Sequence, residues 1–273
     1  MERDYGYKRG FIRHLGFLKA NFYILKKRIF EYKANVWSSI VLEVIYLIIM
    51  LFFYQLIINN FSDVIPWKMK DFILYFMSFL LIFTILGIFT WRMPLYHQIK
   101  EGLFNNYLTR PINPFVFFNS IEMPVPAVVM FFIDTIFFII AIFYFDISIS
   151  SPMIFLVFLL LIMFFYFFFI SFIFSLDFIK LGLSETLFPF INSTQWTFEN
   201  YPAPFFEGLK YKFLMQIFPI FIFGLIIIPI ARDSIGMSFL LKELIVILVM
   251  ILVSAILTLI IWNRGLKRYE AYG

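Results

Sequence analysis

The stretch MIFLVFLLLIMFFYFFFISFIFSL occupies residues 153–176 and contains no charged residue. An α-helix rises about 1.5 Å per residue, so this stretch would form a helix about 36 Å long. The hydrocarbon core of a bilayer is about 30 Å thick, which such a helix can cross. Phenylalanine side chains fall on every side of the helix and leave no polar face for water. The sequence therefore predicts a membrane-spanning helix here.

The composition extends this prediction to the whole chain. Of 273 residues, 63% are apolar, 23% aromatic and 14% charged, whereas a soluble domain carries about 25% charged residues. A soluble fold of this size cannot remove so much apolar surface from water. The chain has no cysteine and only two histidines, His14 and His97, which excludes disulfides, thiolate chemistry and histidine-rich zinc sites. We expect an all-α membrane protein.

Further apolar runs define the rest of the helical bundle. Pro219 and Pro229 bracket one run, 213–230, that suits a re-entrant helical pair within an outer region, 200–235. Residues 1–35 carry charge throughout and form a separate cytoplasmic segment, and 36–273 form a single transmembrane domain. Together with 153–176, the other apolar runs predict six transmembrane helices. They lie at about 36–58, 72–90, 121–145, 153–176, 181–198 and 239–262.

The distribution of lysine and arginine predicts the orientation. With both termini in the cytoplasm, 16 of the 22 basic residues lie inside and six outside, in agreement with the positive-inside rule. Two cytoplasmic termini require an even number of crossings, so 181–198 is expected to cross and 213–230 to turn back. We expect a multi-pass protein of the plasma membrane. The net charge of +5 then reflects orientation and membrane lipids, and no nucleic acid is expected as a partner.

The N-terminal segment contains a helical pattern of its own. Lys19 and Lys26 flank an apolar stripe, where long side chains can reach lipid headgroups. This pattern favours an amphipathic helix in the membrane interface. The same pattern fits equally well a helix that packs on another part of the protein. One helix can also lie in the interface and pack on the protein at the same time. The stripe consists of Phe11, Leu15, Leu18, Phe22, Leu25 and Ile29.

The cytoplasmic loop 91–120 contains a second amphipathic pattern. Residues 97–109 (HQIKEGLFNNYLT) place Ile99, Leu103 and Tyr107 on one face, which predicts a short helix. Two prolines in the following RPINP stretch, 110–114, disfavour helix in the residues before them and end it. A short helix at the cytoplasmic surface can enter a groove on a soluble partner, and a plain connecting loop is the alternative.

The residues of this loop resemble a known family. Ile99–Leu103, Leu108 and 110–114 are similar to the cytoplasmic loop of ABC-type export permeases, in the six-span branch of the type-two membrane subunits. Two further segments are similar to the same branch and extend the resemblance over nearly the whole chain. They are Tyr201-Pro202 followed by Phe218-Pro219, and a closing segment with Trp262, Gly265, Leu266, Lys267, Arg268 and Tyr269, in which Ala271 replaces a common serine.

This resemblance implies a mechanism. Permeases of this branch form dimers, identical or related, and each subunit binds a separate ABC-type ATPase, so that the assembly has two ATPase copies. The loop helix would then be the coupling helix that enters the ATPase, and Arg110 would form an ion pair there, unless it binds a lipid phosphate instead. The residues that the resemblance assigns to this contact are Ile99, Glu101, Gly102, Leu103, Tyr107, Arg110, Pro111, Asn113 and Pro114.

The chain itself lacks the sequence of an ATPase. No GxxxxGK[ST] phosphate-binding loop occurs, and no membrane-hydrolase motif such as GxSxG. We therefore expect no catalysis and no cofactor in this chain, with ATP and Mg²⁺ bound by the partner. The resemblance implies export of a lipophilic or amphipathic compound, such as a drug, lipid, glycoconjugate or peptide.

Two acidic residues within the predicted spans leave an alternative open. Glu43 and Asp134 carry charge at membrane depth, where ionisable groups are costly and often functional. They could line a translocation path, or drive an ion- or proton-coupled secondary transporter, or form hydrogen bonds at packed helix interfaces. A membrane scaffold that only anchors a soluble partner is a third function that the sequence allows.

Overall fold

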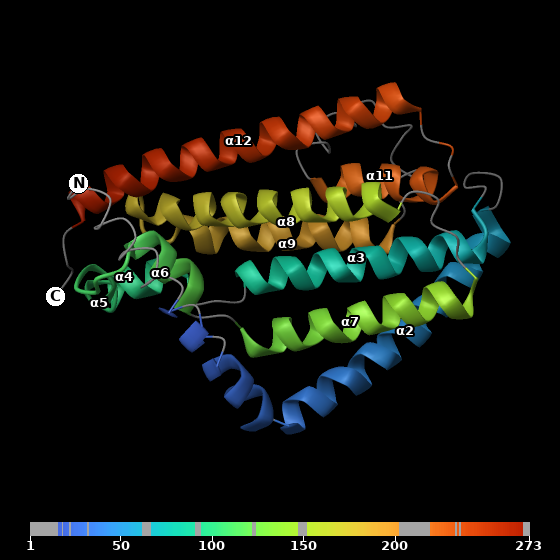
Figure 1. Ribbon diagram of the computed structural model, residues 1–273, viewed down its shortest axis with the longest axis horizontal. Coiled ribbons are helices and arrows are strands. Elements are labelled where there is room, and N and C mark those ends of the chain that lie inside the picture. The colour runs from blue at the N-terminus through green and yellow to red at the C-terminus, as the bar shows by residue number, and fades with distance from the viewer. Residues whose placement is uncertain are drawn as a thin grey trace.

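The structure, a computed structural model, describes residues 16–17, 19–21, 23–31, 33–61, 67–90, 94–121, 124–146, 152–201, 219–232, 234 and 236–269. Every regular element in these ranges is helical, which confirms the predicted all-α class (Figure 1). In chain order the elements are α2 (Lys33–Phe61), α3 (Met69–Thr90), α4 (Leu95–Lys100), α5 (Asn105–Leu108), α6 (Pro114–Ile121), α7 (Val125–Tyr144), α8 (Pro152–Ser175), the 3-10 turn η1 (Leu176–Phe178), α9 (Leu183–Asn200), α11 (Pro219–Ala231) and α12 (Met237–Arg268).

Five helices in the described part of the chain are long and apolar enough to cross a membrane: α2, α3, α7, α8 with η1, and α12. The chain is therefore a multi-pass membrane protein. These five include five of the six predicted spans. The sixth, predicted at 181–198, is the helix α9, which lies beside α8 in Figure 1. Serine, threonine, asparagine and glutamate make α9 less apolar than the other five, and its crossing stays a prediction.

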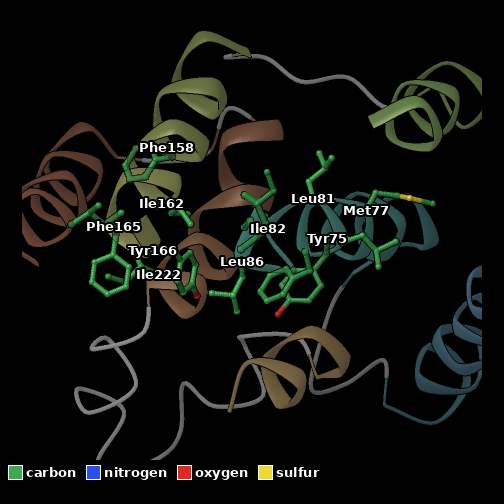
Figure 2. Close-up of a cluster of buried hydrophobic side chains, with 14 of the residues drawn as sticks. Tyr75, Met77, Leu81, Ile82, Leu86, Phe158, Ile162, Phe165, Tyr166 and Ile222 are labelled. Atoms are coloured by element: carbon green, nitrogen blue, oxygen red, sulfur yellow. The ribbon is translucent and has the colours of Figure 1, made fainter. Parts of the chain in front are cut away.

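The helix α3 forms the centre of the bundle. It packs against α7 and α8 on two sides and also contacts α11, α2 and α9, so that most of its length is buried. Figure 2 shows Tyr75, Ile82 and Leu86 from α3 beside Ile162 and Tyr166 from α8. By contrast, α2 and α12 expose most of their surface as aliphatic side chains. Those two helices provide much of the surface that acyl chains contact.

One end of the bundle gathers the segments predicted to be cytoplasmic. In Figure 1 the short helices α4, α5 and α6 lie at the left, beside the C-terminal end of α12. We call this the α4–α6 end. The start of α3, the start of α8 and the start of α12 lie at the right, which we call the opposite end. The helices thus alternate in direction as a multi-pass chain requires.

The predicted outer region is described in part. The described part of α11 has 13 residues and is about 20 Å long, which is less than the bilayer core of about 30 Å. Its Ile222, Ile226 and Ile230 are buried. The Arg232 guanidinium after it binds the carboxylate of Asp71 at the start of α3, with Nε and Oδ1 3.1 Å apart. Residues 202–218 lie outside the described residues, so the re-entrant pair itself stays a prediction.

The described residues between 16 and 31 are helical and pack on the protein. Phe17 stacks on Phe117 of α6, with ring centroids 5.0 Å apart, and Asn21 Nδ2 donates to Ser120 O at 2.9 Å. Leu25 is buried, whereas the basic side chains nearby are exposed. Phe11, Leu15, Leu18 and Phe22 of the predicted stripe lie outside the described residues. Packing on α6 leaves the exposed, lysine-bearing side of this segment available to a membrane surface. Those exposed basic residues are Lys19, Lys26, Lys27 and Arg28.

Candidate functional site

The loop expected to form one helix over 97–109 instead forms two. α4 ends at Lys100, residues 101–104 make a tight turn, and α5 begins at Asn105. The reason is Gly102, which has a φ of +70° in the left-handed region that glycine adopts without steric cost. The turn is closed by main-chain bonds from Gly102 N to Ile99 O (3.1 Å) and from Phe104 N to Gln98 O (2.9 Å). The prediction of a single helix was wrong.

This break separates the residues that the periodic pattern had placed on one face. Ile99 and Tyr107 are buried, with 3% and 5% of their surfaces exposed. Leu103, at the tip of the turn, has 39% of its surface exposed. Gly102 and Pro114 are half-buried. Glu101, Arg110, Pro111 and Asn113 are exposed. A soluble partner could therefore touch Leu103 and the exposed residues directly, whereas Ile99 and Tyr107 hold the loop from inside.

The turn is anchored to the bundle through Phe104, which is fully buried. Its ring centroid lies 5.6 Å from that of Phe178 in η1 and 6.0 Å from that of Trp262 in α12. Tyr269, just after α12, packs edge-on at 5.1 Å. We call the following six residues the aromatic cluster: Phe104, Phe115, Phe118, Phe178, Trp262 and Tyr269. Rings from the turn, from α6, from η1 and from the end of α12 meet in it.

Polar and steric contacts reinforce this connection. The Tyr269 hydroxyl donates to Asn105 Oδ1 at 3.2 Å, and partial burial raises the pKa of Tyr269, so the phenol stays a donor at neutral pH. Gly265 lies directly against Phe178: a Cβ at this position would be 2.3 Å from Phe178 Cγ. Trp262, Gly265 and Tyr269 follow one another at spacings of three and four and so share one face of α12. That spacing was the signal that this closing segment packs on the loop, and sequence reasoning missed it.

A buried carboxylate fixes α4 to the start of α9. Asp177 in η1 has 1% of its surface exposed and accepts hydrogen bonds from Tyr96 N (3.1 Å), Ser184 N (3.0 Å) and Ser184 Oγ (2.6 Å). It thus satisfies amide groups in the first turns of two helices, as helix-capping carboxylates do. His97 Nε2 and Glu185 Oε1 lie 3.1 Å apart and link the same two helices at the surface. Neither link was predicted.

The surface around the turn is positively charged. Lys100 Nζ donates to the Tyr96 hydroxyl at 3.2 Å, and this hydrogen bond raises the pKa of Lys100, with smaller contributions from the carboxylates of Glu185 and Glu101. Arg110 is exposed nearby on the chain. Basic residues at the ends of α8 and α12 are also exposed at the α4–α6 end: Lys180, Arg264, Lys267 and Arg268. An acidic partner surface would complement this end of the molecule.

Glu43 and Asp134 lie in the bundle, away from the turn. Glu43 has 5% and Asp134 1% of its surface exposed. Each lies about 15 Å along its helix from the first residue of that helix, at a rise of about 1.5 Å per residue. On α2, Glu43 shares the inward face with Met50 and Tyr54, and on α7 Asp134 shares it with Phe138. The structure therefore does not bring these two acids to the turn at 101–104.

The helix α9 presents a polar face that sequence reasoning did not single out. Thr186, Asn192 and Ser193 are exposed along it. Ser193 Oγ donates back to Pro189 O and Thr197 Oγ1 to Ser193 O (2.9 Å), so some of these hydroxyls are satisfied within the helix. The Asn192 side chain remains at the surface. A helix of bilayer length with such a face is unsuited to contact with acyl chains.

Comparison with known proteins decides between the open alternatives. Residues 44–273 match the family described as ABC-2 family transporter protein. The chain belongs to this family. No curated protein and no solved structure matches the chain.

Membership of the ABC-2 family confirms the resemblance drawn from the loop and the closing segment. The match covers the turn at 101–104, the aromatic cluster and α12, whereas the N-terminal segment before residue 44 lies outside it. An ABC-2 permease subunit is not itself catalytic and carries no cofactor. Such permeases generally pair with an ATPase subunit. The loop at the α4–α6 end is the candidate site for that pairing.

Proposed function

We propose that this ABC-2 permease subunit exports a lipophilic or amphipathic compound, a drug, lipid, glycoconjugate or peptide, across the plasma membrane. It works as a pair of permeases, identical or related, with two copies of a separate ATPase and both termini in the cytoplasm. The observation that carries this proposal is the turn at 101–104. Its tip is exposed at Leu103, while its base is buried through Phe104.

The exposed part of the loop makes the contact with the ATPase. Glu101 and Leu103 lie at the tip of the turn, and Arg110, Pro111 and Asn113 follow on the same loop. Arg110 pairs with a carboxylate of the ATPase, since a guanidinium and a carboxylate form the stronger, charge-assisted type of hydrogen bond. Gly102 shapes the turn and Pro114 begins α6. Ile99 and Tyr107 act from inside the loop, because their burial leaves little surface for a partner.

The anchored base transmits movement of the turn to the bundle. A displacement of Leu103 by the ATPase also displaces Phe104, which contacts Phe178 in η1 and Trp262 in α12. Packed interiors resist compression and pass such displacements to their neighbours. Since α12 runs from the turn to the opposite end (Figure 1), ATP-driven closure of the ATPases can change the outer side of the permease.

The polar face of α9 lines the translocation path, together with the second permease. Asn192 and Ser193 are exposed in a single subunit, and the partner subunit or the cargo replaces lipid there. Glu43 and Asp134 belong to the same path as buried acids that become accessible when the bundle opens. Membership of the ABC-2 family favours ATP over an ion gradient as the source of energy for this opening of the bundle.

Purification of the tagged chain from its own membranes tests the coupling surface. We expect a P-loop ATPase to purify with it, and Arg110→Gln to lower the ATPase activity that depends on this chain by about fivefold, the value of one exposed ion pair. Lys68→Gln removes a comparable exposed charge at the opposite end and serves as the control. Equal activity in the two variants would remove Arg110 from the contact, and absence of any ATPase would overturn the proposal.

A further inference from the structure

A cavity lies between α2, α3 and α7, away from the loop and from α9. Its volume is about 190 Å³. Its walls include Leu47 and Leu51 from α2, Ile73 and Met77 from α3, and Ile140 and Ala141 from α7. Aromatic rings complete the lining, and nearly all of its surface is carbon. In Figure 2 the Met77 side chain points away from the α8 residues of the core, so the cavity lies on the other side of α3.

The position of the cavity places it in one leaflet of the bilayer. Its α3 residues lie within about 12 Å of the start of that helix, at a rise of about 1.5 Å per residue. Its α2 and α7 residues come from the second halves of those helices. All of them therefore lie toward the opposite end. Tyr144, which lines the cavity and has 79% of its surface exposed, is at the depth where tyrosine marks the membrane interface.

The chemistry of the walls selects an aliphatic occupant. A buried water needs two to four polar partners, and these walls offer almost none. At this depth the surrounding solvent is the acyl chains of the bilayer. A chain that enters between α2 and α7 replaces missing contacts with the aliphatic walls, and each such contact adds a small dispersion gain.

A lysine stands at the mouth of the cavity. Lys70 precedes Ile73 and Met77 on the same face of α3 and is exposed. Its Nζ donates to the main-chain oxygen of Asp146 at 3.1 Å, and Asp146 directly follows the wall residue Phe145. An ammonium has three donor hydrogens, so two remain for another acceptor. The nearby Asp71 carboxylate is already paired with Arg232.

We propose that the cavity holds part of one acyl chain of a bilayer phospholipid, whose phosphate binds Lys70. The aliphatic walls take the chain, and the ammonium group at the membrane interface takes the anionic group of the same molecule. This site lies on the α2–α7 side of α3, apart from the polar face of α9. It is therefore a site for a lipid that stays bound, and it does not depend on the proposed ATPase contact.

The test uses the full chain in vesicles that contain a trace of phosphatidylglycerol with a photoreactive group on one acyl chain. After illumination, peptides carrying the label are identified by mass spectrometry. We expect labelling concentrated on cavity residues of α2 and α7, and reduced at least threefold by Ile140→Trp, which fills the cavity from a half-exposed wall position. Leu252→Phe enlarges an exposed side chain on α12 and leaves the labelling unchanged.

Competition with unlabelled lipids tests the headgroup and does not depend on a variant that folds poorly. Phosphatidylglycerol is expected to compete about fivefold better than diacylglycerol, which is the gain from one exposed ion pair. Lys70→Gln should remove that difference. Lys68→Gln is the control and should keep it. Label spread evenly over the exposed faces of α2, α7 and α12 would overturn the proposal. Equal competition by the two lipids in the unaltered chain would also overturn it.

Discussion

Replacing Gly265 with alanine tests whether the end of α12 and the turn at 101–104 form one packed unit. The added Cβ would lie 2.3 Å from Cγ, 2.5 Å from Cδ2 and 2.6 Å from Cβ of Phe178. Carbon atoms in van der Waals contact are about 3.5–4.0 Å apart, so the two groups must separate by about 1.2 Å. Because Phe178 Cβ is among the atoms touched, a ring rotation cannot relieve the overlap. The η1 backbone or α12 itself has to move.

The size of the effect follows from two opposing contributions. An extra carbon in a tightly packed interior costs about 1–3 kcal/mol, and this overlap belongs at the upper end of that range. Alanine is favoured over glycine inside a helix by about 1 kcal/mol. The net loss is therefore about 2 kcal/mol in the free energy of unfolding. For a chain of this length that lowers the midpoint of thermal unfolding by about 4–8 °C.

Two assays measure the consequence. The midpoint of thermal unfolding in detergent reports stability, and ATPase activity that depends on the chain reports coupling. We expect both to fall in Gly265→Ala, while the amount of bound ATPase stays the same. Gly16→Ala is the matched control, because a Cβ at Gly16 meets nothing within 4 Å. In a Phe178→Ala background, the overlaps with Cγ and Cδ2 disappear and the one with Cβ remains, so the cost of Gly265→Ala should fall in part. Equal behaviour of Gly265→Ala and Gly16→Ala would refute the reasoning.

Three further substitutions probe other parts of the molecule. Asp177→Ala removes the acceptor of three hydrogen bonds in a buried position, and we expect a loss of about 3 kcal/mol in unfolding free energy. The control is Glu31→Ala, which removes an exposed carboxylate. Gly102→Ala forces a Cβ into the left-handed region and costs about 1 kcal/mol, which lowers the unfolding midpoint by about 2–4 °C. We expect chain-dependent ATPase activity to fall as well, and an unchanged activity would contradict this. Arg232→Gln breaks a partly exposed pair with Asp71 and should cost less than about 1 kcal/mol, so a fall of more than 5 °C in the unfolding midpoint would contradict it.

The long helices were predictable because bilayer thickness sets a length that few other structures require. Runs of about 20 predominantly apolar residues predicted α2, α3, α7, α8 and α12, and the structure has a helix at each. α9 was predicted at the correct place for a different reason, the charge rule, although its own composition is mixed. Whether a helix such as α9 crosses the membrane depends on a partner that covers its polar face. The sequence of one chain carries less information about such a helix.

The loop shows why the details of a site are harder to predict. Ile99, Leu103 and Tyr107 repeat every four residues, and that pattern continues through Gly102 without any sign of a break. The left-handed φ of Gly102 becomes favourable only because Phe104 then reaches a buried place among rings from η1 and α12. With 42 phenylalanines in the chain, composition cannot indicate which rings meet. Such pairings depend on long-range packing.

Two of the three segments that carry the resemblance, the loop and the closing segment, pack against each other in the structure. The loop motif supplies an exposed tip at Leu103 and a buried base beside it, and the closing motif supplies Trp262 and Gly265, which receive that base. A loop that only bound a partner would need the exposed tip alone. Phe104 is buried against α12, which has 32 residues and is about 48 Å long. This burial is what we expect if force applied at the tip has to reach the opposite end. The close approach of Gly265 to Phe178 leaves no space between η1 and α12 at this point, as the proposed transmission requires.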